Sequence, residues 1–187
     1  MKGWQTKLSG AGLTLLLSGC SAIFGPEEQG PACPNVALLA DAAHQTHYAD
    51  GPGRDLTDIA YQADLTGITG ECRYDFDDAV GRNPTKVTVL MDLALKAVIG
   101  PASKSRHVDL TYFVAIVDPK HKVLARQEFN LPVDFQDAKG AYFGKDQLEQ
   151  EIPLGPKDKT AAGYQVLVGL KLDQDEVDRN RAKRKTQ

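Results

Sequence analysis

Hydrophobic and polar residues alternate along most of this chain, and this period of two constrains the fold more than any other feature. Successive side chains of a β-strand point to opposite sides, so a strand with one buried face shows this alternation. Residues 86–96 are the clearest case, because one face would carry only apolar side chains: Val87, Val89, Met91, Leu93 and Leu95. This segment is therefore expected to be a half-buried antiparallel strand.

A hairpin is expected earlier in the chain. Residues 58–65 alternate in the same way, and the alternation resumes over residues 72–76. Thr69-Gly70 lies between these two segments and is typical of a two-residue turn. The sequence therefore predicts two antiparallel strands joined at Thr69 and Gly70.

Three more strands are predicted in the second half of the chain, over residues 108–117, 123–133 and 164–172. Two shorter segments are less distinctive. Residues 35–43 fit either a first strand or a short helical turn, and residues 145–151 fit one helical turn. Short strands separated by Gly and Pro turns favour an all-β fold.

The expected architecture is a single antiparallel β-sandwich over residues 35–173, followed by a short C-terminal helix and basic tail over residues 174–187. Asp173 is a candidate N-cap, with Glu176 three residues on. Five basic residues crowd the tail: Arg179, Arg181, Lys183, Arg184 and Lys185. They fit a contact with anionic lipid or a polyanionic wall polymer. We favour the simpler interpretation of a solvated, disordered tail.

One part of the chain resembles the turn into a late strand of fibronectin type III and immunoglobulin-like domains. It consists of residues 152–156, followed by Gly163-Tyr164-Gln165. The resemblance implies a tyrosine corner, in which the Tyr164 hydroxyl would bond to an upstream backbone group. The loop here is longer than in those domains. The single tryptophan, Trp4, lies outside the predicted strands. We therefore expect an immunoglobulin- or fibronectin-III-like sandwich.

The N-terminus has the layout of a cleaved export signal. Lys2 and Lys7 precede an apolar run over residues 8–17, far shorter than the roughly 20 residues that span a bilayer as a helix. The run ends in Leu-Ser-Gly-Cys at residues 17–20. This segment resembles the leader and lipobox of bacterial lipoproteins. The whole chain, with its cysteine pair, its Gly-Arg-Asp loop at residues 53–55 and Asn-Arg after the last strand, also resembles a group of uncharacterised proteobacterial envelope lipoproteins. The alternative is an ordinary secretory leader that happens to carry a cysteine.

The resemblance implies cleavage of residues 1–19 as a signal peptide and lipid attachment to Cys20. Ser21 at the next position implies an outer membrane location facing the periplasm. Two or three acyl chains would anchor the protein stably to the membrane. Residues 20–34 would then be the lipidated cysteine and a flexible linker rich in Pro, Gly and Glu.

Two cysteines remain once Cys20 carries lipid, namely Cys33 and Cys72. Paired thiols of an exported protein persist as disulfides, so a Cys33–Cys72 bond is predicted. Closing a loop of this length is worth roughly 3–4 kcal/mol in the chain-entropy model. A metal site at these cysteines lacks further ligands at zinc spacing.

The charge of the chain excludes one class of partner. The mature chain would have 168 residues, and losing Lys2 and Lys7 from 22 basic residues leaves 20 against 25 acidic ones, a formal net charge of −5. Nucleic acid binding needs a basic surface, so no nucleic acid partner is expected.

Metal and cofactor sites are weakly indicated. His44 and His47 are three apart, so one helical turn would bring them together, with Asp41 and Asp50 nearby. A polar loop is the more ordinary interpretation, and no metal and no cofactor are expected. A second acidic group could bind Ca²⁺ weakly but is more simply a solvated loop; its members are Glu71, Asp75, Asp77 and Asp78.

The remaining candidates form a possible contact surface. Arg54 follows Gly51-Pro52-Gly53 and could bind an anionic partner, or could pair with Asp55, Asp58 or a strand-end carbonyl. Tyr142 and Phe143 are expected in loops, where they could contact sugar or protein. No catalytic residues are assigned, because no nucleophile elbow and no free cysteine remain.

The sequence therefore predicts a lipid-anchored envelope protein that is not an enzyme. Its domain is expected to be a binding or assembly module that docks another envelope protein through edge strands or loops. The alternative is a carbohydrate or cell-wall-polymer binder that uses Tyr142, Phe143 and the basic tail. A more remote alternative is a metal-dependent hydrolase at His44 and His47.

Overall fold

The computed structural model describes residues 31–77, 83–136 and 139–185. The predicted signal peptide, Cys20 and most of the linker lie outside the described residues, as does Asp78. In the part that is described, no helix is both long and apolar enough to cross a membrane.

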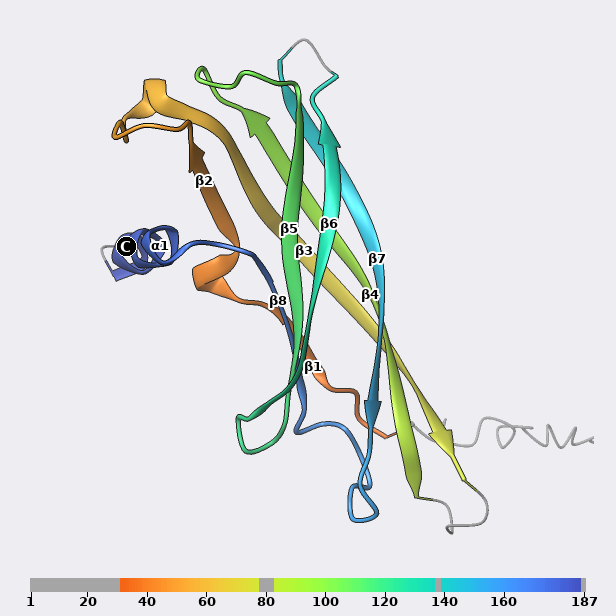
Figure 1. Ribbon diagram of the computed structural model, residues 1–187. Helices are drawn as coiled ribbons and strands as arrows, with labels where there is room; N and C mark the ends of the chain where they lie inside the picture. Colours follow the sequence, from red (N-terminus) through yellow and green to blue (C-terminus); the bar gives the residue numbers. More distant parts are fainter. Residues whose placement is uncertain (1–30, 78–82, 137–138, 186–187) are drawn as a thin grey trace, which may run out of the picture. The chain divides into compact units, whose positions relative to one another are not determined.

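Two four-stranded sheets make up the described chain, and we call them sheet A and sheet B (Figure 1). In sheet A the order is β1 (Asn35–Leu38), β8 (Gln165–Leu170), β5 (His107–Val117) and β6 (Val123–Asp134). In sheet B it is β2 (His44–Tyr48), β3 (Ile59–Phe76), β4 (Pro84–Ile99) and β7 (Ala141–Pro153). Two 3₁₀ turns and one helix complete the described elements: η1 (Ala40–Ala42), η2 (Leu56–Asp58) and α1 (Gln174–Lys185).

The predicted all-β sandwich is confirmed, and its pairing is antiparallel except between β1 and β8. The core lies between the inner faces of the two sheets. The five inward positions predicted for residues 86–96 are all buried, and they are Val87, Val89, Met91, Leu93 and Leu95. Sheet A contributes the facing layer, including Leu110, Tyr112, Val114, Val166 and Val168.

The hairpin predicted at Thr69-Gly70 is wrong, because β3 runs through this pair as one strand of 18 residues. Gly70 pairs with Met91 of β4 inside the sheet. A Cβ at Gly70 would lie 2.8 Å from Cγ2 of Val36, so the missing side chain lets β1 pack closely against β3. Here glycine permits a close approach between strands rather than a turn.

The helical turn predicted over residues 145–151 is also wrong. This segment belongs to β7, which pairs with β4 from Lys86↔Pro153 to Val98↔Ala141. Leu148 and Ile152 are buried against the core, as a strand with one inner face requires. For residues 35–43 both predicted alternatives occur, because β1 is followed by the 3₁₀ turn η1.

The immunoglobulin resemblance holds for architecture but not for strand order. Immunoglobulin constant domains group their first, second, fifth and fourth strands in one sheet, whereas sheet B here is β2-β3-β4-β7. Tyr164 precedes β8, as expected for a residue at the turn. Its hydroxyl donates a hydrogen bond to Oδ2 of Asp158 at 3.1 Å, a side chain rather than the backbone group of a tyrosine corner.

The Cys33–Cys72 disulfide is confirmed, and it joins the segment before β1 to β3. Hydrogen bonds reinforce this tie. The Tyr74 hydroxyl donates to the carbonyl oxygen of Ala32 at 2.6 Å, and the Thr160 hydroxyl donates to the same oxygen at 2.9 Å. The start of the domain is thus fastened to β3 and to the loop before β8.

A capping box begins α1, as predicted. The backbone N–H of Glu176 donates to Oδ1 of Asp173 at 2.7 Å, and the N–H of Asp173 donates to Oε2 of Glu176 at 3.0 Å. These reciprocal bonds satisfy donors that the first helical turn leaves without partners.

The solvated tail favoured from the sequence is wrong, because α1 docks on η1 and β2. The Asn180 side chain donates to the carbonyl oxygens of Asp41 at 3.0 Å and His44 at 2.7 Å. Arg181 Nε lies 3.0 Å from Oδ2 of Asp41, and Arg184 Nη1 lies 3.0 Å from its Oδ1. Much of the basic segment is therefore part of the folded domain.

Candidate functional site

The two histidines proposed for a metal site lie on a strand, and the helical turn expected to join them is absent. The ring of His44 forms a hydrogen bond from Nδ1 to Asp64 at 2.5 Å. His47 stacks on Tyr61, with the ring centroids 4.8 Å apart. Among the described residues, no group of three His, Cys, Asp or Glu side chains is placed to hold a metal ion.

Arg54 closes the loop after β2. Its Nη1 donates to the carbonyl oxygens of Gly51 at 2.8 Å and Gly53 at 2.6 Å, which belong to the loop itself and not to a strand end as predicted. Asp55 and Asp58 instead form the capping box of η2. In this arrangement Arg54 stabilises the conformation of its own loop.

A small pocket of about 210 Å³ lies beside Tyr48, between β2, the following loop and α1. The Arg54 and Arg179 guanidinium carbons lie 5.4 and 5.6 Å from the centroid of the Tyr48 ring. Four carboxylate residues also line this pocket: Asp50, Asp173, Asp175 and Glu176. The lining thus carries both signs of charge, and the contact of Arg179 with Tyr48 joins α1 to β2.

Tyr142 and Phe143 do not form a paired aromatic surface. They are not in loops but next to each other on β7, so their side chains lie on opposite faces of sheet B. Tyr142 packs against the core, whereas Phe143 is 74% exposed beside Lys96. Arg54 lies in the loop after β2, and β3 and β4 separate β2 from β7 in sheet B. The structure therefore does not bring the three predicted contact residues together.

Two tyrosines of the core region have raised pKa values. Burial raises the pKa of Tyr61 to about 12, and the negative charge of Glu176 adds to the effect. Burial and a hydrogen bond to Asp146 raise the pKa of Tyr112. The Tyr112 hydroxyl donates to Oδ2 of Asp146 at 2.7 Å and so links β5 of sheet A to β7 of sheet B. Both phenols therefore stay protonated at neutral pH.

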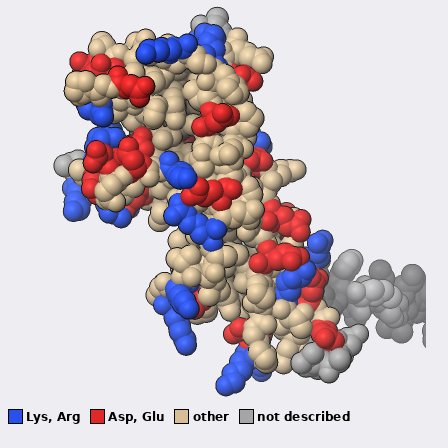
Figure 2. Space-filling view, in the orientation of Figure 1, with Lys and Arg blue, Asp and Glu red and all other residues tan. Residues whose placement is uncertain are grey.

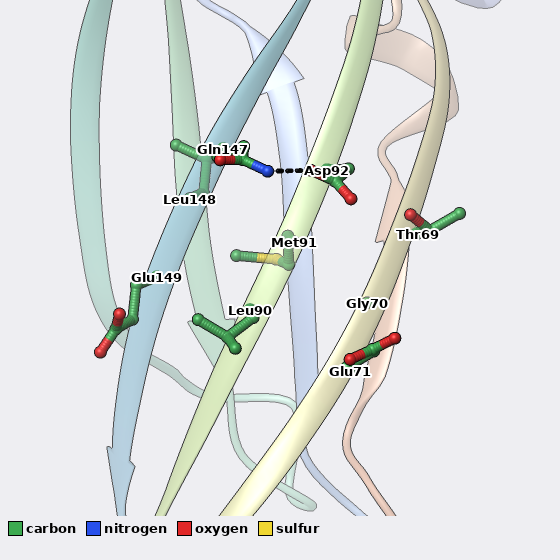
Figure 3. Close-up of a pocket in the computed structure, with 9 residues that line it drawn as sticks. All are labelled: Thr69, Gly70, Glu71, Leu90, Met91, Asp92, Gln147, Leu148 and Glu149. Atoms are coloured by element: carbon green, nitrogen blue, oxygen red, sulfur yellow. Dashed lines mark hydrogen bonds between the residues drawn. The ribbon is translucent and has the colours of Figure 1, made fainter.

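A hollow of about 590 Å³ lies on the outer face of sheet B across β3, β4 and β7 (Figure 3). We call it the sheet B groove, and it is lined by Thr69, Gly70, Glu71, Leu90, Met91, Asp92, Gln147, Leu148 and Glu149. Gly70, Met91 and Leu148 belong to the inward-facing positions, and Met91 and Leu148 are buried. The strand register places the outward residues in two rows, Glu71–Leu90–Glu149 and Thr69–Asp92–Gln147.

The groove combines an apolar centre with negative charge. Leu90 is 40% exposed between two carboxylates, those of Glu71 and Glu149. Asp92 in the adjacent row accepts a hydrogen bond from Nε2 of Gln147 at 3.0 Å. None of the nine lining residues is basic. This arrangement suits a partner with a positive charge beside an apolar group.

The acidic cluster considered for calcium is divided by the structure. Glu71 lies in the groove, whereas Oδ2 of Asp75 lies 3.3 Å from Nζ of Lys86. Asp77 follows the end of β3. Closeness in sequence thus grouped Glu71 with carboxylates that lie elsewhere along or after β3. It did not identify Asp92 of β4 and Glu149 of β7, which line the groove together with Glu71.

Charges of both signs are interspersed over the face of the molecule shown in Figure 2, without one continuous basic patch on that face. The groove carries a local set of carboxylates around Leu90. No protein-family model matches this chain, and no curated protein and no solved structure is significantly similar to it, so its function is argued from these residues.

Proposed function

We propose that this chain is a lipid-anchored protein of the bacterial cell envelope, held at the outer membrane by Cys20 and facing the periplasm. Its domain would act as a non-enzymatic binding or assembly module. The motif at residues 17–20 supports the anchor. The Cys33–Cys72 bond supports export, because disulfides persist in oxidising compartments.

The sheet B groove is the proposed docking surface, and its partner would be a basic, partly apolar segment of another envelope protein. The observation that carries this is the exposed Leu90 among three carboxylates, those of Glu71, Asp92 and Glu149. Opposite charge would steer the partner and set its orientation, while contact with Leu90 would exclude water. The three strands β3, β4 and β7 lie side by side over about 10 Å, which is wide enough for one peptide segment.

Membrane attachment makes a modest affinity sufficient. A lipid anchor confines the domain to one surface and so raises the effective concentration of a partner held at that surface. The polymer-binding alternative has less support, because Tyr142 and Phe143 face opposite ways and Asp41 engages two basic residues of the tail, Arg181 and Arg184.

The anchor is tested by the intact mass of the protein purified from its native envelope. We expect the mass of residues 20–187 plus covalently attached acyl groups. A Cys20→Ser variant should lose the acyl mass and fractionate away from membranes. A native mass that fits an uncleaved or unlipidated chain would overturn the anchor.

The groove is tested by charge reversal. The full-length Glu71→Lys/Glu149→Lys variant should recover its partner from intact envelopes at least about tenfold less well than the unsubstituted protein, a loss of roughly 1.4 kcal/mol. The matched control, Asp50→Lys/Asp109→Lys, changes the net charge equally but lies outside the groove.

Both variants are first compared by urea unfolding, so that a folding defect is recognised. The control should retain the recovery of the unsubstituted protein. Equal losses in the two variants would remove the groove from the proposal. Failure to recover any specific partner with the unsubstituted protein would count against the binding module itself.

A further inference from the structure

β6 is an edge strand whose outer side has no partner among the described residues. It occupies the end of sheet A and pairs only with β5. Most of its 12 residues are exposed, including Val123 at 56% and Leu124 at 49%. An edge strand presents unpaired N–H and C=O groups that can pair with another strand.

Pro132 limits the part of β6 that is available for pairing. Proline has no N–H and cannot donate to a ladder, which is why it is found at sheet edges. Pro132 lies opposite Asp109 near the end of β6. Residues 123–131 remain as a proline-free stretch.

We propose that β6 pairs in antiparallel fashion with β6 of a second copy of this chain, about a two-fold axis at Gln127. This register pairs residues 125–129 of each copy, which lie clear of the β-bulge between Val123 and Ala125, and it leaves Pro132 outside the pairing. Arg126 then lies opposite Glu128 of the second copy, and the two-fold axis generates the same ion pair again. Opposite charges in directly facing positions stabilise a strand pair.

The two faces of this pair are complementary in different ways. Phe129 stacks on Tyr112 and lies on the inner face, so Ala125 and Leu131 lie on that face too. Val123 does not, because a β-bulge in the β5–β6 ladder pairs it with Val117. Pairing about Gln127 sets Ala125 against Phe129 of the second copy. The inner face thus gains two apolar contacts, while the outer face carries the ion pairs.

Neighbouring registers are disfavoured by charge. An axis at residue 126 would place Arg126 opposite its own copy, and an axis at residue 128 would do the same for Glu128. Like charges directly opposite each other destabilise a strand pair. Glu128 stays ionised because Lys171, at 2.7 Å, lowers the pKa of its carboxyl group.

In the register about Gln147, β7 at the corresponding edge of sheet B is less complementary to itself than β6. This register pairs Lys145 with Glu149 of the second copy, but it also sets Asp146 against Leu148 and Phe143 against Glu151. The last two pairs each join a carboxylate to an apolar side chain, which the β6 register about Gln127 does not do.

The first test is disulfide trapping with the full-length chain in mild detergent. Facing residues of an antiparallel pair have Cβ atoms about 4.5–5.5 Å apart, close to the range of a disulfide. Gln127→Cys should therefore form a cross-linked dimer on mild oxidation at least about tenfold faster than Gln147→Cys on β7. The unsubstituted chain controls for native cysteines. Equal rates for the two variants, or faster cross-linking of Gln147→Cys, would overturn the β6 interface.

The second test is a charge swap, read by the dimer dissociation constant in sedimentation. Arg126→Glu alone and Glu128→Arg alone should each weaken the dimer at least about tenfold, and the double exchange should restore it. Urea unfolding of each variant identifies any folding defect. A protein that stays monomeric throughout, or a double exchange as weak as the single variants, would overturn the proposal. The charge swap changes no residue that lines the sheet B groove, so its outcome does not depend on the groove or its partner.

Discussion

Replacing Cys33 and Cys72 together by alanine is expected to lower the free energy of unfolding by about 4 kcal/mol. The bond joins residues 39 apart, so it removes considerable loop entropy from the unfolded chain. It also fixes the segment before β1 to β3, where the bond from Tyr74 to Ala32 depends on the same placement.

Urea unfolding under non-oxidising conditions checks this value. The unsubstituted protein should fall to the stability of the double variant when it is reduced, which separates the bond from the loss of two side chains. A change under about 1 kcal/mol would show that the unfolded chain is already compact in this region.

Asn180→Ala is expected to cost about 2 kcal/mol, because one side chain holds two backbone carbonyls. Each hydrogen bond is worth about 1 kcal/mol, and a carbonyl left without a donor adds to the cost. The carbonyls of Asp41 and His44 belong to the segment on which α1 docks. Losing both bonds should loosen α1 before the sheets unfold.

Two measurements test the effect of Asn180→Ala. Urea unfolding gives the loss of stability, and trypsin should cleave the basic α1 segment faster in the variant. Gln174→Ala is the matched control, because the Gln174 side chain donates to Asp178 on the exposed side of the same helix. Similar losses in both variants would contradict a special role for Asn180.

The docking of α1 also changes how a tail deletion must be interpreted. Removing residues 181–187 deletes Arg181 and Arg184, which both contact Asp41. Loss of polymer binding after such a deletion would therefore not demonstrate a polymer-binding tail. Charge reversal at Lys185 is a cleaner probe, because it leaves these contacts in place.

The strands with one buried face could be predicted from the sequence. In β4, inward and outward residues differ strongly in polarity, so local alternation identifies the buried set. The capping box of α1 was also predictable, since Asp173 and Glu176 are only three residues apart. Both signals are local in the chain.

The predictions that were wrong concern features that depend on contacts between residues distant in sequence. Gly70 looked like a turn because its close contact with Val36 of β1 is invisible locally. Lys145 to Glu151 looked helical because the pairing with β4 decides its conformation. The tail looked solvated because its acceptor, Asp41, is about 140 residues away.

The candidate site was harder still to predict. The sheet B groove joins residues 69–71, 90–92 and 147–149, and only the register of β3, β4 and β7 brings them together. Sequence proximity instead grouped Glu71 with Asp75, which pairs with Lys86. Carboxylates on three strands carry no common local motif.

The Cys33–Cys72 bond has a mechanical consequence. Tension applied to the chain on the N-terminal side of the domain reaches Cys33 before it reaches β1. The disulfide passes that force to the long strand β3, whereas β1 has only four residues paired with β8. β1 is therefore shielded from being peeled away residue by residue, and the sheets stay closed under a pull that would otherwise unzip their shortest strand.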